Sequence, residues 1–341
     1  MLKVGLIGLG YMGSAHVSQY MRLMKEGFPI KLVAICDVNE EKKMGKLTQG
    51  NIDISDKSID FSQFHFYTKM EEMLEKEELD YVDICLPTYL HAPYAIQAME
   101  KGLHVFCEKP MAISTEACQE MIDASEKYNR SLMIGQTLRF FPSYLYVKET
   151  IESGRYGKCT EANLFRGGET PKWSWENWLL TKEKSGGCLL DQHIHDVDTI
   201  NWLFGSPKQV QTAGKTVFEG SGYDIVSTNY LFDDKVVNAQ DNWTFNSPQF
   251  RFEMRFRFVF EKGAIILENG TLTDYPFGEE AFTPAIDPEN GYYLEIKYFA
   301  ECVLEGTNPN ERVPVQSTKE TIRIAEAEVQ SADTSKPVRL S

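Results

Sequence analysis

The first third of the chain alternates short apolar runs with amphipathic stretches. Runs that are too apolar for a half-exposed sheet predict strands buried on both faces, at residues 4–7, 32–35, 81–86, 104–107 and 132–134. Stretches with apolar residues at helical spacing predict helices over residues 14–25, 40–47, 69–75, 93–101 and 115–128. This alternation implies right-handed crossovers. It predicts an α/β Rossmann fold, which is a doubly wound parallel sheet.

From about residue 159 the apolar positions recur with a period of two. The clearest case is residues 251–258, where four apolar side chains alternate with Arg251, Glu253, Arg255 and Arg257. Further strands are expected at residues 210–218, 224–232 and 236–245, and late helices at residues 293–304 and 319–329. The pattern predicts a C-terminal α+β domain with a large, mainly antiparallel open sheet. We expect domains over residues 1–125 and 126–341.

A glycine-rich turn follows the first predicted strand. Gly8, Gly10 and Gly13 fit the spacing G-x-G-x-x-G, with Tyr11 and Met12 between them. The first glycine permits a tight turn, the second lets a pyrophosphate approach the backbone, and the third permits close helix–strand packing. Glycines also mark ordinary turns, but this motif stands between a strand and a helix, where the helix N-terminus attracts phosphates. The placement predicts dinucleotide binding.

Asp37 ends the second predicted strand, where an acid that binds ribose is expected. Its carboxylate can accept hydrogen bonds from a ribose 2′-OH and would repel a 2′-phosphate. Residues 38–41 offer no Arg to hold such a phosphate. NAD is therefore favoured over NADP. A helix-capping role for Asp37 is an alternative that is compatible with ribose binding.

Two clusters carry candidate chemistry. Glu108 and Lys109 precede Pro110 at the carboxyl end of a predicted parallel strand, which is where ligands of open α/β sheets bind. Lys109 can polarise a substrate oxygen there, although a surface lysine before a loop proline is an equal alternative. Asp191 and His195 are four residues apart in a predicted helix, so both can address one ligand, with His195 as proton acceptor.

The pair His193 and His195 also permits a metal interpretation. Residues two apart in a helix point to different sides, so we expect no metal. A plain capping and packing role remains the alternative for this whole segment. Trp178 belongs to a segment with three tryptophans in six residues, residues 173–178. Such faces suit sugar rings, but buried packing is the commoner role.

Composition narrows the partners. The chain has 341 residues with 50 acidic and 35 basic side chains, a formal charge of −15, which disfavours nucleic acid and anionic membranes. Seven scattered cysteines without a C-x-x-C pair indicate a reducing compartment. No apolar run approaches membrane-spanning length, and the first eight residues do not fit a signal peptide. We expect a cytoplasmic protein.

The combined motifs resemble the Gfo/Idh/MocA family of glucose–fructose oxidoreductases and inositol dehydrogenases. The resemblance rests on residues 8–13 with Asp37, on residues 108–110, and on Gly186-Gly187 followed by Asp191 and residues 195–198. It implies that Lys109 and His195 are the catalytic pair and that Asp191 contacts substrate. It also implies a cofactor groove lined by Leu86, Pro87, Thr88, His91, Glu108, Lys109 and Gln136, and a substrate site bordered by Arg139 and Trp178.

His193 departs from the family pattern, which commonly has glycine two residues before the catalytic histidine. Its side chain is expected to reshape the pocket, to add a hydrogen-bonding group, or to point away. The resemblance implies an NAD-dependent oxidoreductase for a secondary alcohol of a sugar, inositol or related polyol. An NAD-assisted glycoside hydrolase and a non-enzymatic dinucleotide sensor are the alternatives. The sheet face that carries the arginines is either solvated or a subunit interface, and the second alternative predicts a homodimer or homotetramer.

Overall fold

The computed structural model describes residues 1–45, 59–247, 250 and 252–340, and these form two compact units. The first unit comprises Met1–Thr137, Trp173–Trp178 and Tyr292–Lys319. The second comprises Leu138–Lys172, Leu179–Gly291 and Glu320–Ser341. The chain therefore enters the first unit three times. The predicted domains, residues 1–125 and 126–341, are each one continuous segment, so they do not include the return of residues 173–178 and 292–319 to the first unit.

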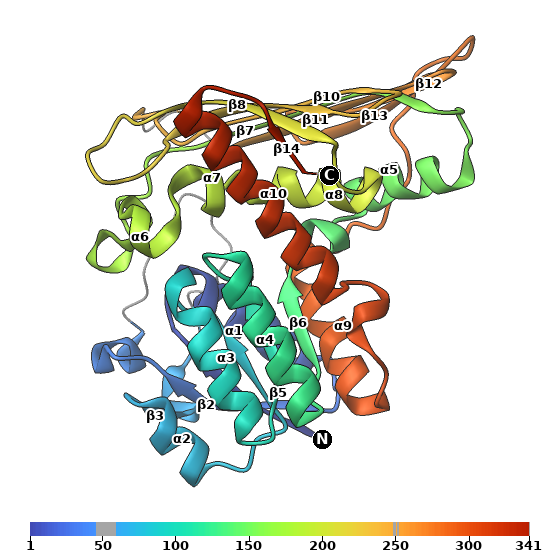
Figure 1. Ribbon diagram of the computed structural model, residues 1–341. Helices are drawn as coiled ribbons and strands as arrows, with labels where there is room; N and C mark the ends of the chain where they lie inside the picture. The colour runs from blue at the N-terminus through green and yellow to red at the C-terminus, as the bar shows by residue number, and fades with distance from the viewer. Residues whose placement is uncertain (46–58, 248–249, 251, 341) are drawn as a thin grey trace. The chain divides into compact units, whose positions relative to one another are not determined.

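The first unit contains a six-stranded parallel sheet (Figure 1). Its order is β3-β2-β1-β4-β5-β6. Successive strands are added on one side of β1 up to β3 and on its other side from β4 onward, and this reversal of strand order defines a doubly wound fold. The five predicted strands are confirmed, and a three-residue strand was missed. The strands are β1 (Leu2–Ile7), β2 (Ile30–Cys36), β3 (His65–Tyr67), β4 (Tyr81–Ile84), β5 (His104–Glu108) and β6 (Leu132–Gly135).

Four predicted helices of this unit are confirmed: α1 (Tyr11–Lys25), α2 (Met70–Lys76), α3 (His91–Glu100) and α4 (Thr115–Tyr128). The fifth, expected over residues 40–47, was wrong in type, because Glu40–Met44 forms a short 3-10 helix. Asn39 caps it by accepting a hydrogen bond from the Glu41 amide at 3.1 Å. Residues 46 and 47 of that prediction lie outside the described residues.

Helix α9 (Gly291–Glu305) contributes to the core of the first unit. The ring of Phe299 lies 5.2 Å from that of Tyr81 on β4 and 5.6 Å from that of Phe106 on β5, measured between centroids. The predicted second domain, residues 126–341, includes this helix. Its apolar face instead packs on the parallel sheet, about 190 residues after those strands in the chain.

The second unit contains an eight-stranded open sheet, and this confirms the predicted fold class. Its order is β13-β12-β11-β7-β10-β9-β8-β14, and every described pairing is antiparallel except β7 with β10. The strands are β7 (Cys159–Gly167), β8 (Gln209–Lys215), β9 (Ile225–Leu231), β10 (Val236–Asn242), β11 (Glu253–Phe260), β12 (Gly263–Glu268), β13 (Thr271–Pro276) and β14 (Val338–Arg339).

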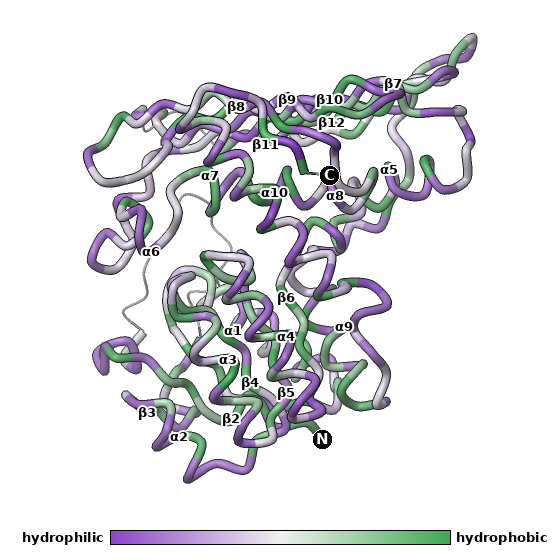
Figure 2. Tube along the Cα trace, viewed as in Figure 1, coloured by the Kyte–Doolittle hydropathy of each residue, from purple (hydrophilic) through white to green (hydrophobic). Residues whose placement is uncertain are grey.

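Helices cover one face of this sheet (Figures 1 and 2). The covered face is the one that carries the apolar side chains of the period-two pattern. On β11, Phe256 and Phe258 are buried whereas Arg255 and Arg257 lie on the opposite, exposed face, which confirms the predicted alternation; Arg251 lies outside the described residues. Phe256 packs on Tyr144 of a covering helix, with 5.0 Å between ring centroids. The covering helices are α5 (Pro142–Ser153), α7 (Gly187–Asp191), α8 (Ile194–Phe204) and α10 (Val315–Thr334), and the short helix α6 (Lys182–Ser185) precedes α7 in the same unit.

Candidate active site

The glycine turn of the first unit has the geometry of a dinucleotide site. Gly8 has a positive φ of 96°, and a Cβ at Gly13 would lie 1.9 Å from the carbonyl oxygen of Gly8. A Cβ at Gly10, in contrast, would meet no atom within 4 Å. Gly10 also caps α1, whose first turn carries no acidic residue. The space beside Gly10 and its position at the N-terminus of α1 therefore fit a pyrophosphate.

Asp37 joins the second strand to the glycine turn. Its carboxylate accepts hydrogen bonds from the amides of Leu9 at 2.8 Å and of Asn39 at 2.9 Å. It also pairs with the ammonium of Lys42 at 2.7 Å. Lys42 was not predicted as a partner of Asp37, because only an Arg within residues 38–41 was considered at this position. The short 3-10 helix at Glu40–Met44 turns the chain back, so that a lysine five residues away reaches the carboxylate.

The residues expected on the nicotinamide side lie at the ends of β4, β5 and β6. His91 links two of these ends, because its ring nitrogens lie 2.8 Å from the carbonyl oxygens of Leu86 and of Pro110. Burial lowers the pKa of His91. Thr88 and Gln136 are also buried, and neither Thr88 Oγ1 nor Gln136 Nε2 has a hydrogen-bond partner among the described residues. Such orphaned groups fit a site that a bound cofactor completes.

Lys109 follows β5 and its side chain is partly exposed. The peptide bond between Lys109 and Pro110 is cis. Glu108, in contrast, is buried: its carboxylate accepts from the Lys109 amide at 3.1 Å and lies 2.9 Å from His16 Nε2. This placement supports a role for Glu108 in holding the turn rather than direct cofactor contact.

A buried polar cluster that the sequence did not reveal lies behind this turn. The ring of His16, on α1, bridges Glu108 and Asp83, whose carboxylate also accepts from Tyr20 Oη at 2.8 Å. Burial opposes charge on His16, but Asp83 outweighs it and holds the pKa well above its usual range. Burial and the charge of Glu108 raise the pKa of Glu295 well above its usual range. The signal in the sequence was Asp83, a charged residue inside an apolar strand.

Two sets of side chains in the described part of the chain are close enough to share a metal ion. Both contain His16, once with Asp83 and Cys85 and once with Glu108 and Glu295. The ring of His16 already contacts Asp83 and Glu108 at hydrogen-bond distance. We therefore assign these groups to a hydrogen-bonded network and derive no metal chemistry from them.

In the second unit, Asp191 and His195 flank a break between two helices. The sequence predicted one continuous helix, and this was wrong: α7 ends at Asp191 and α8 begins at Ile194. Both side chains are partly exposed, whereas the polar side chains at positions 193, 196 and 198 are buried. The break therefore sorts this segment into a pair that can meet a ligand and three residues that face the interior.

Buried ion pairs anchor the start of α8. Arg139 forms a two-point pair with Asp198, at 2.9 and 2.7 Å, and is only 1% exposed. Arg166 on β7 pairs with Asp196 at 2.7 Å. Burial raises the pKa of Asp196 to about 6, against the opposing charge of Arg166. The placement of Arg139 supports a positioning role rather than the substrate contact that the resemblance implied.

His193 points into the interior of the second unit. Its ring contacts Asp241 on β10 and Tyr230 on β9, at 2.5 and 3.1 Å. Of the three expectations for this residue, the third holds, although the ring makes specific contacts. In the first unit, Trp178 is half-buried and Glu176 and Asn177 have positive φ angles of 49° and 52°. The substrate role of Trp178 stays a prediction.

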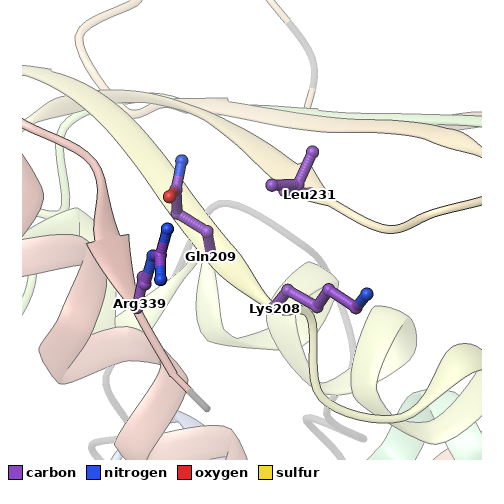
Figure 3. Close-up of a pocket in the computed structure, with 4 residues that line it drawn as sticks. All are labelled: Lys208, Gln209, Leu231 and Arg339. Atoms are coloured by element: carbon purple, nitrogen blue, oxygen red, sulfur yellow. The ribbon is translucent and has the colours of Figure 1, made fainter.

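A depression at the edge of the eight-stranded sheet contains none of the predicted site residues (Figure 3). It lies where β8 pairs with β14 and is lined by Lys208, Gln209, Leu231 and Arg339. Lys208 is paired with Asp233 at 2.6 Å. Because the four lining residues include no histidine and no carboxylate, we do not regard it as the active site.

The parallel sheet with its glycine turn and Asp37, joined to an open mixed sheet, defines the class of NAD-binding oxidoreductases. Comparison with family models agrees. Residues 2–136 match the model described as an oxidoreductase family with NAD-binding Rossmann fold, and residues 144–266 match the GFO/IDH/MocA C-terminal domain. The chain belongs to the GFO/IDH/MocA oxidoreductase family.

Curated relatives include two bacterial proteins of different names. Over 235 residues the chain is 28% identical to 2,7-anhydro-N-acetylneuraminate hydratase of Mediterraneibacter gnavus, covering 67% of this chain and 58% of that protein. Over 243 residues it is 31% identical to an uncharacterized oxidoreductase of Streptococcus pneumoniae, covering 69% and 60%. The chain thus spans about three fifths of the length of these relatives.

The fold is also that of solved dehydrogenases. Levoglucosan dehydrogenase, solved in complex with NADH and levoglucosan, superposes with a TM-score of 0.84 at 22% identity, covering 99% of both chains. At this identity the likeness shows the fold alone. Within the described residues, no helix is both long and apolar enough to cross a membrane.

Proposed function

We propose that this protein transfers hydride between NAD and a secondary alcohol of a sugar, inositol or related polyol. The observation that carries the proposal is the selective exposure of Lys109, Asp191 and His195. Nearly all polar groups next to them in the chain are buried, yet these three side chains are partly exposed. Lysine, aspartate and histidine are the residue types that bind and deprotonate an alcohol.

In the proposed mechanism, NAD supplies the hydride acceptor when bound. The turn that Gly8 and Gly13 shape would hold its pyrophosphate on the open side of Gly10, and Asp37 would hold its ribose. Asp191 accepts a hydrogen bond from a substrate hydroxyl. His195 takes the proton of the reacting hydroxyl, while Lys109 stabilises the negative charge that develops on its oxygen. The alcohol thereby becomes a ketone, and its proton ends on the imidazole.

We propose NAD as the preferred dinucleotide because a buried carboxylate stands at the ribose position. The ammonium of Lys42 neutralises part of that charge, since it lies 2.7 Å from Asp37. This pair therefore makes the preference for NAD over NADP smaller than an isolated carboxylate would give.

We also propose a cytoplasmic homodimer or homotetramer. The exposed face of β11 supports the oligomeric state. Analytical ultracentrifugation tests the oligomeric state.

The first test is absorbance at the reduced-nicotinamide band with the purified protein and a panel of inositols, aldoses and sugar acids. NAD and NADP are run in parallel. A rise with one subset of the panel and NAD supports the proposal and identifies the substrate class. No rise with any member, while NAD binding is confirmed by calorimetry, counts against it.

Replacement of His195 tests the assignment of the proton acceptor. We expect His195→Ala to lower kcat by about 10²–10⁴-fold, because the proton has no acceptor in the transition state. The Kd for NAD should change less than about twofold, since His195 and the glycine turn belong to different units. An equal loss of turnover and NAD affinity would contradict the assignment.

A second candidate is a reaction that uses NAD without net reduction, such as hydration or glycoside cleavage. The observation that favours it is the relative from Mediterraneibacter gnavus, which is named a hydratase. The two candidates differ in cofactor balance: the second consumes an anhydro-sugar or glycoside while the NAD concentration stays constant. Product analysis by mass spectrometry, with NADH absorbance recorded in the same sample, separates them.

A further inference from the structure

His193 is the joint between α7 and α8. Its amide donates to the Cys188 carbonyl at 2.9 Å, which ends α7. Its own carbonyl accepts from the amides of Asp196 at 2.9 Å and Val197 at 3.1 Å, which begins α8. Asp191 stands two residues before this joint and His195 two residues after it. Gln192 shares the joint, since its amide also donates to the Cys188 carbonyl at 2.9 Å. The conformation at these two residues therefore sets the course of the chain between Asp191 and His195.

Three separate elements hold the ring of His193. Nδ1 lies 2.5 Å from Asp241 Oδ2 on β10. Nε2 lies 3.1 Å from Tyr230 Oη on β9 and 3.3 Å from Glu328 Oε2 on α10. The side chain of His193 is 0% exposed. A glycine at this position would make none of these contacts. The histidine side chain therefore makes the connection of the α7–α8 joint to the sheet and to α10.

The charges around this ring favour an imidazolium. Burial alone would lower the pKa of His193, but Glu328 and Asp241 outweigh it and raise the pKa well above its usual range. Arg166 is the second cation, 2.7 Å from Asp196 and 3.9 Å from Asp241. Two cations thus face three buried carboxylates. Removal of His193 would leave buried negative charge without compensation, which is strongly destabilising.

The order Asp241, His193, Tyr230 is reminiscent of a catalytic acid–histidine–hydroxyl array. All three side chains are buried, however, and no substrate atom can reach Tyr230 Oη. The array is therefore structural. We propose that His193 is a positioning residue, which presents Asp191 and His195 to the substrate by fastening the α7–α8 joint to Asp241 and Glu328. This inference rests on the proposed function, because it takes Asp191 and His195 as the reacting pair.

The test compares His193→Gly, His193→Gln and Asp241→Asn with an exposed control, His65→Asn, in the first unit. We expect His193→Gly to lower kcat by about 10²-fold, which is the usual effect of displacing catalytic groups by about 1 Å. Asp241→Asn should lower kcat in the same direction without a change of volume. His193→Gln should recover part of the loss, because it keeps an N–H donor. The Kd for NAD should stay within about twofold in all variants.

A second measurement does not depend on turnover. The chain has six histidines, so their ring protons can be titrated individually by NMR. The titration midpoint of His195 should shift in His193→Gly and in Asp241→Asn, and not in His65→Asn. If the wild-type protein oxidises no member of the panel, the proposed function fails, and this shift alone still decides the positioning role. An unchanged His195 titration in both variants would overturn the inference, even if their melting temperatures fall.

Discussion

Replacing Asp37 by serine should invert the choice between NAD and NADP. In the wild-type protein the Asp37 carboxylate is buried and accepts hydrogen bonds from the Leu9 amide and from Lys42. A bound ribose adds hydrogen bonds to this carboxylate, and hydrogen bonds to charged groups contribute about 1.5–3 kcal/mol. Their loss should weaken NAD binding by about 10–150-fold. The serine also removes the charge that opposes a 2′-phosphate.

Lys42 determines how much NADP gains. Without Asp37, its ammonium becomes available to the 2′-phosphate, in a charge-assisted contact of about 1.5–3 kcal/mol. The ratio of the two dissociation constants should therefore change by at least about 10²-fold in favour of NADP. Isothermal titration calorimetry with each dinucleotide measures this directly, and kcat/KM for each gives an independent value.

Two further variants isolate the causes. Asp37→Asn removes the charge but keeps an oxygen that can accept a hydrogen bond from the Leu9 amide. It therefore separates the effect of the lost charge from the effect of a disturbed glycine turn. The double variant Asp37→Ser, Lys42→Met should lose the increase in NADP affinity, while its affinity for NAD stays as low as in Asp37→Ser. An unchanged NAD-to-NADP ratio in Asp37→Ser would refute the assignment of Asp37 to the ribose.

The remaining predictions concern stability. Arg139→Met should lower the free energy of unfolding by about 3–5 kcal/mol, because it leaves the buried Asp198 carboxylate without its cation; urea denaturation checks this, and a loss below about 1 kcal/mol would contradict it. Phe299→Ala should cost a similar 3–5 kcal/mol, read from the same experiment, since it opens a cavity between α9 and the parallel sheet. The pKa of His193 is higher in the folded protein than the value of about 6.5 expected in the unfolded chain. His193 should therefore stabilise the protein fully below about pH 6.5, and this stabilisation should decline as the pH rises through the folded-state pKa. His193→Gln should flatten this decline, and equal slopes in the two proteins would refute it.

The parallel sheet was predictable because its strands are buried on both faces, so that composition alone marks them. Strand β3 was not, since His65–Tyr67 is only three residues long and its side chains are not fully buried. Helix α9 could be predicted as a helix but not assigned to its unit. Its apolar face fits any core, and only the contact of Phe299 with Tyr81 and Phe106 identifies the right one.

The candidate site was predictable where a local motif fixes the geometry, as at Gly8–Gly13. It was not predictable where a side chain depends on a turn several residues away. Lys42 reaches Asp37 only because a 3-10 helix reverses the chain. His193 faces Asp241 only because α7 ends before it. The periodicity of a continuous helix gave no sign of that break.

The late return of the chain to the first unit has a consequence for biosynthesis. The rings of Tyr81 and Phe106 are covered by Phe299, which a ribosome adds roughly 160 residues after the last strand of the parallel sheet. At ordinary elongation rates this interval lasts on the order of ten seconds. During that time the nascent sheet would present an apolar face to the cell. We expect the emerging chain to bind general chaperones until residue 305 has left the exit tunnel, and fragments that stop before α9 to aggregate.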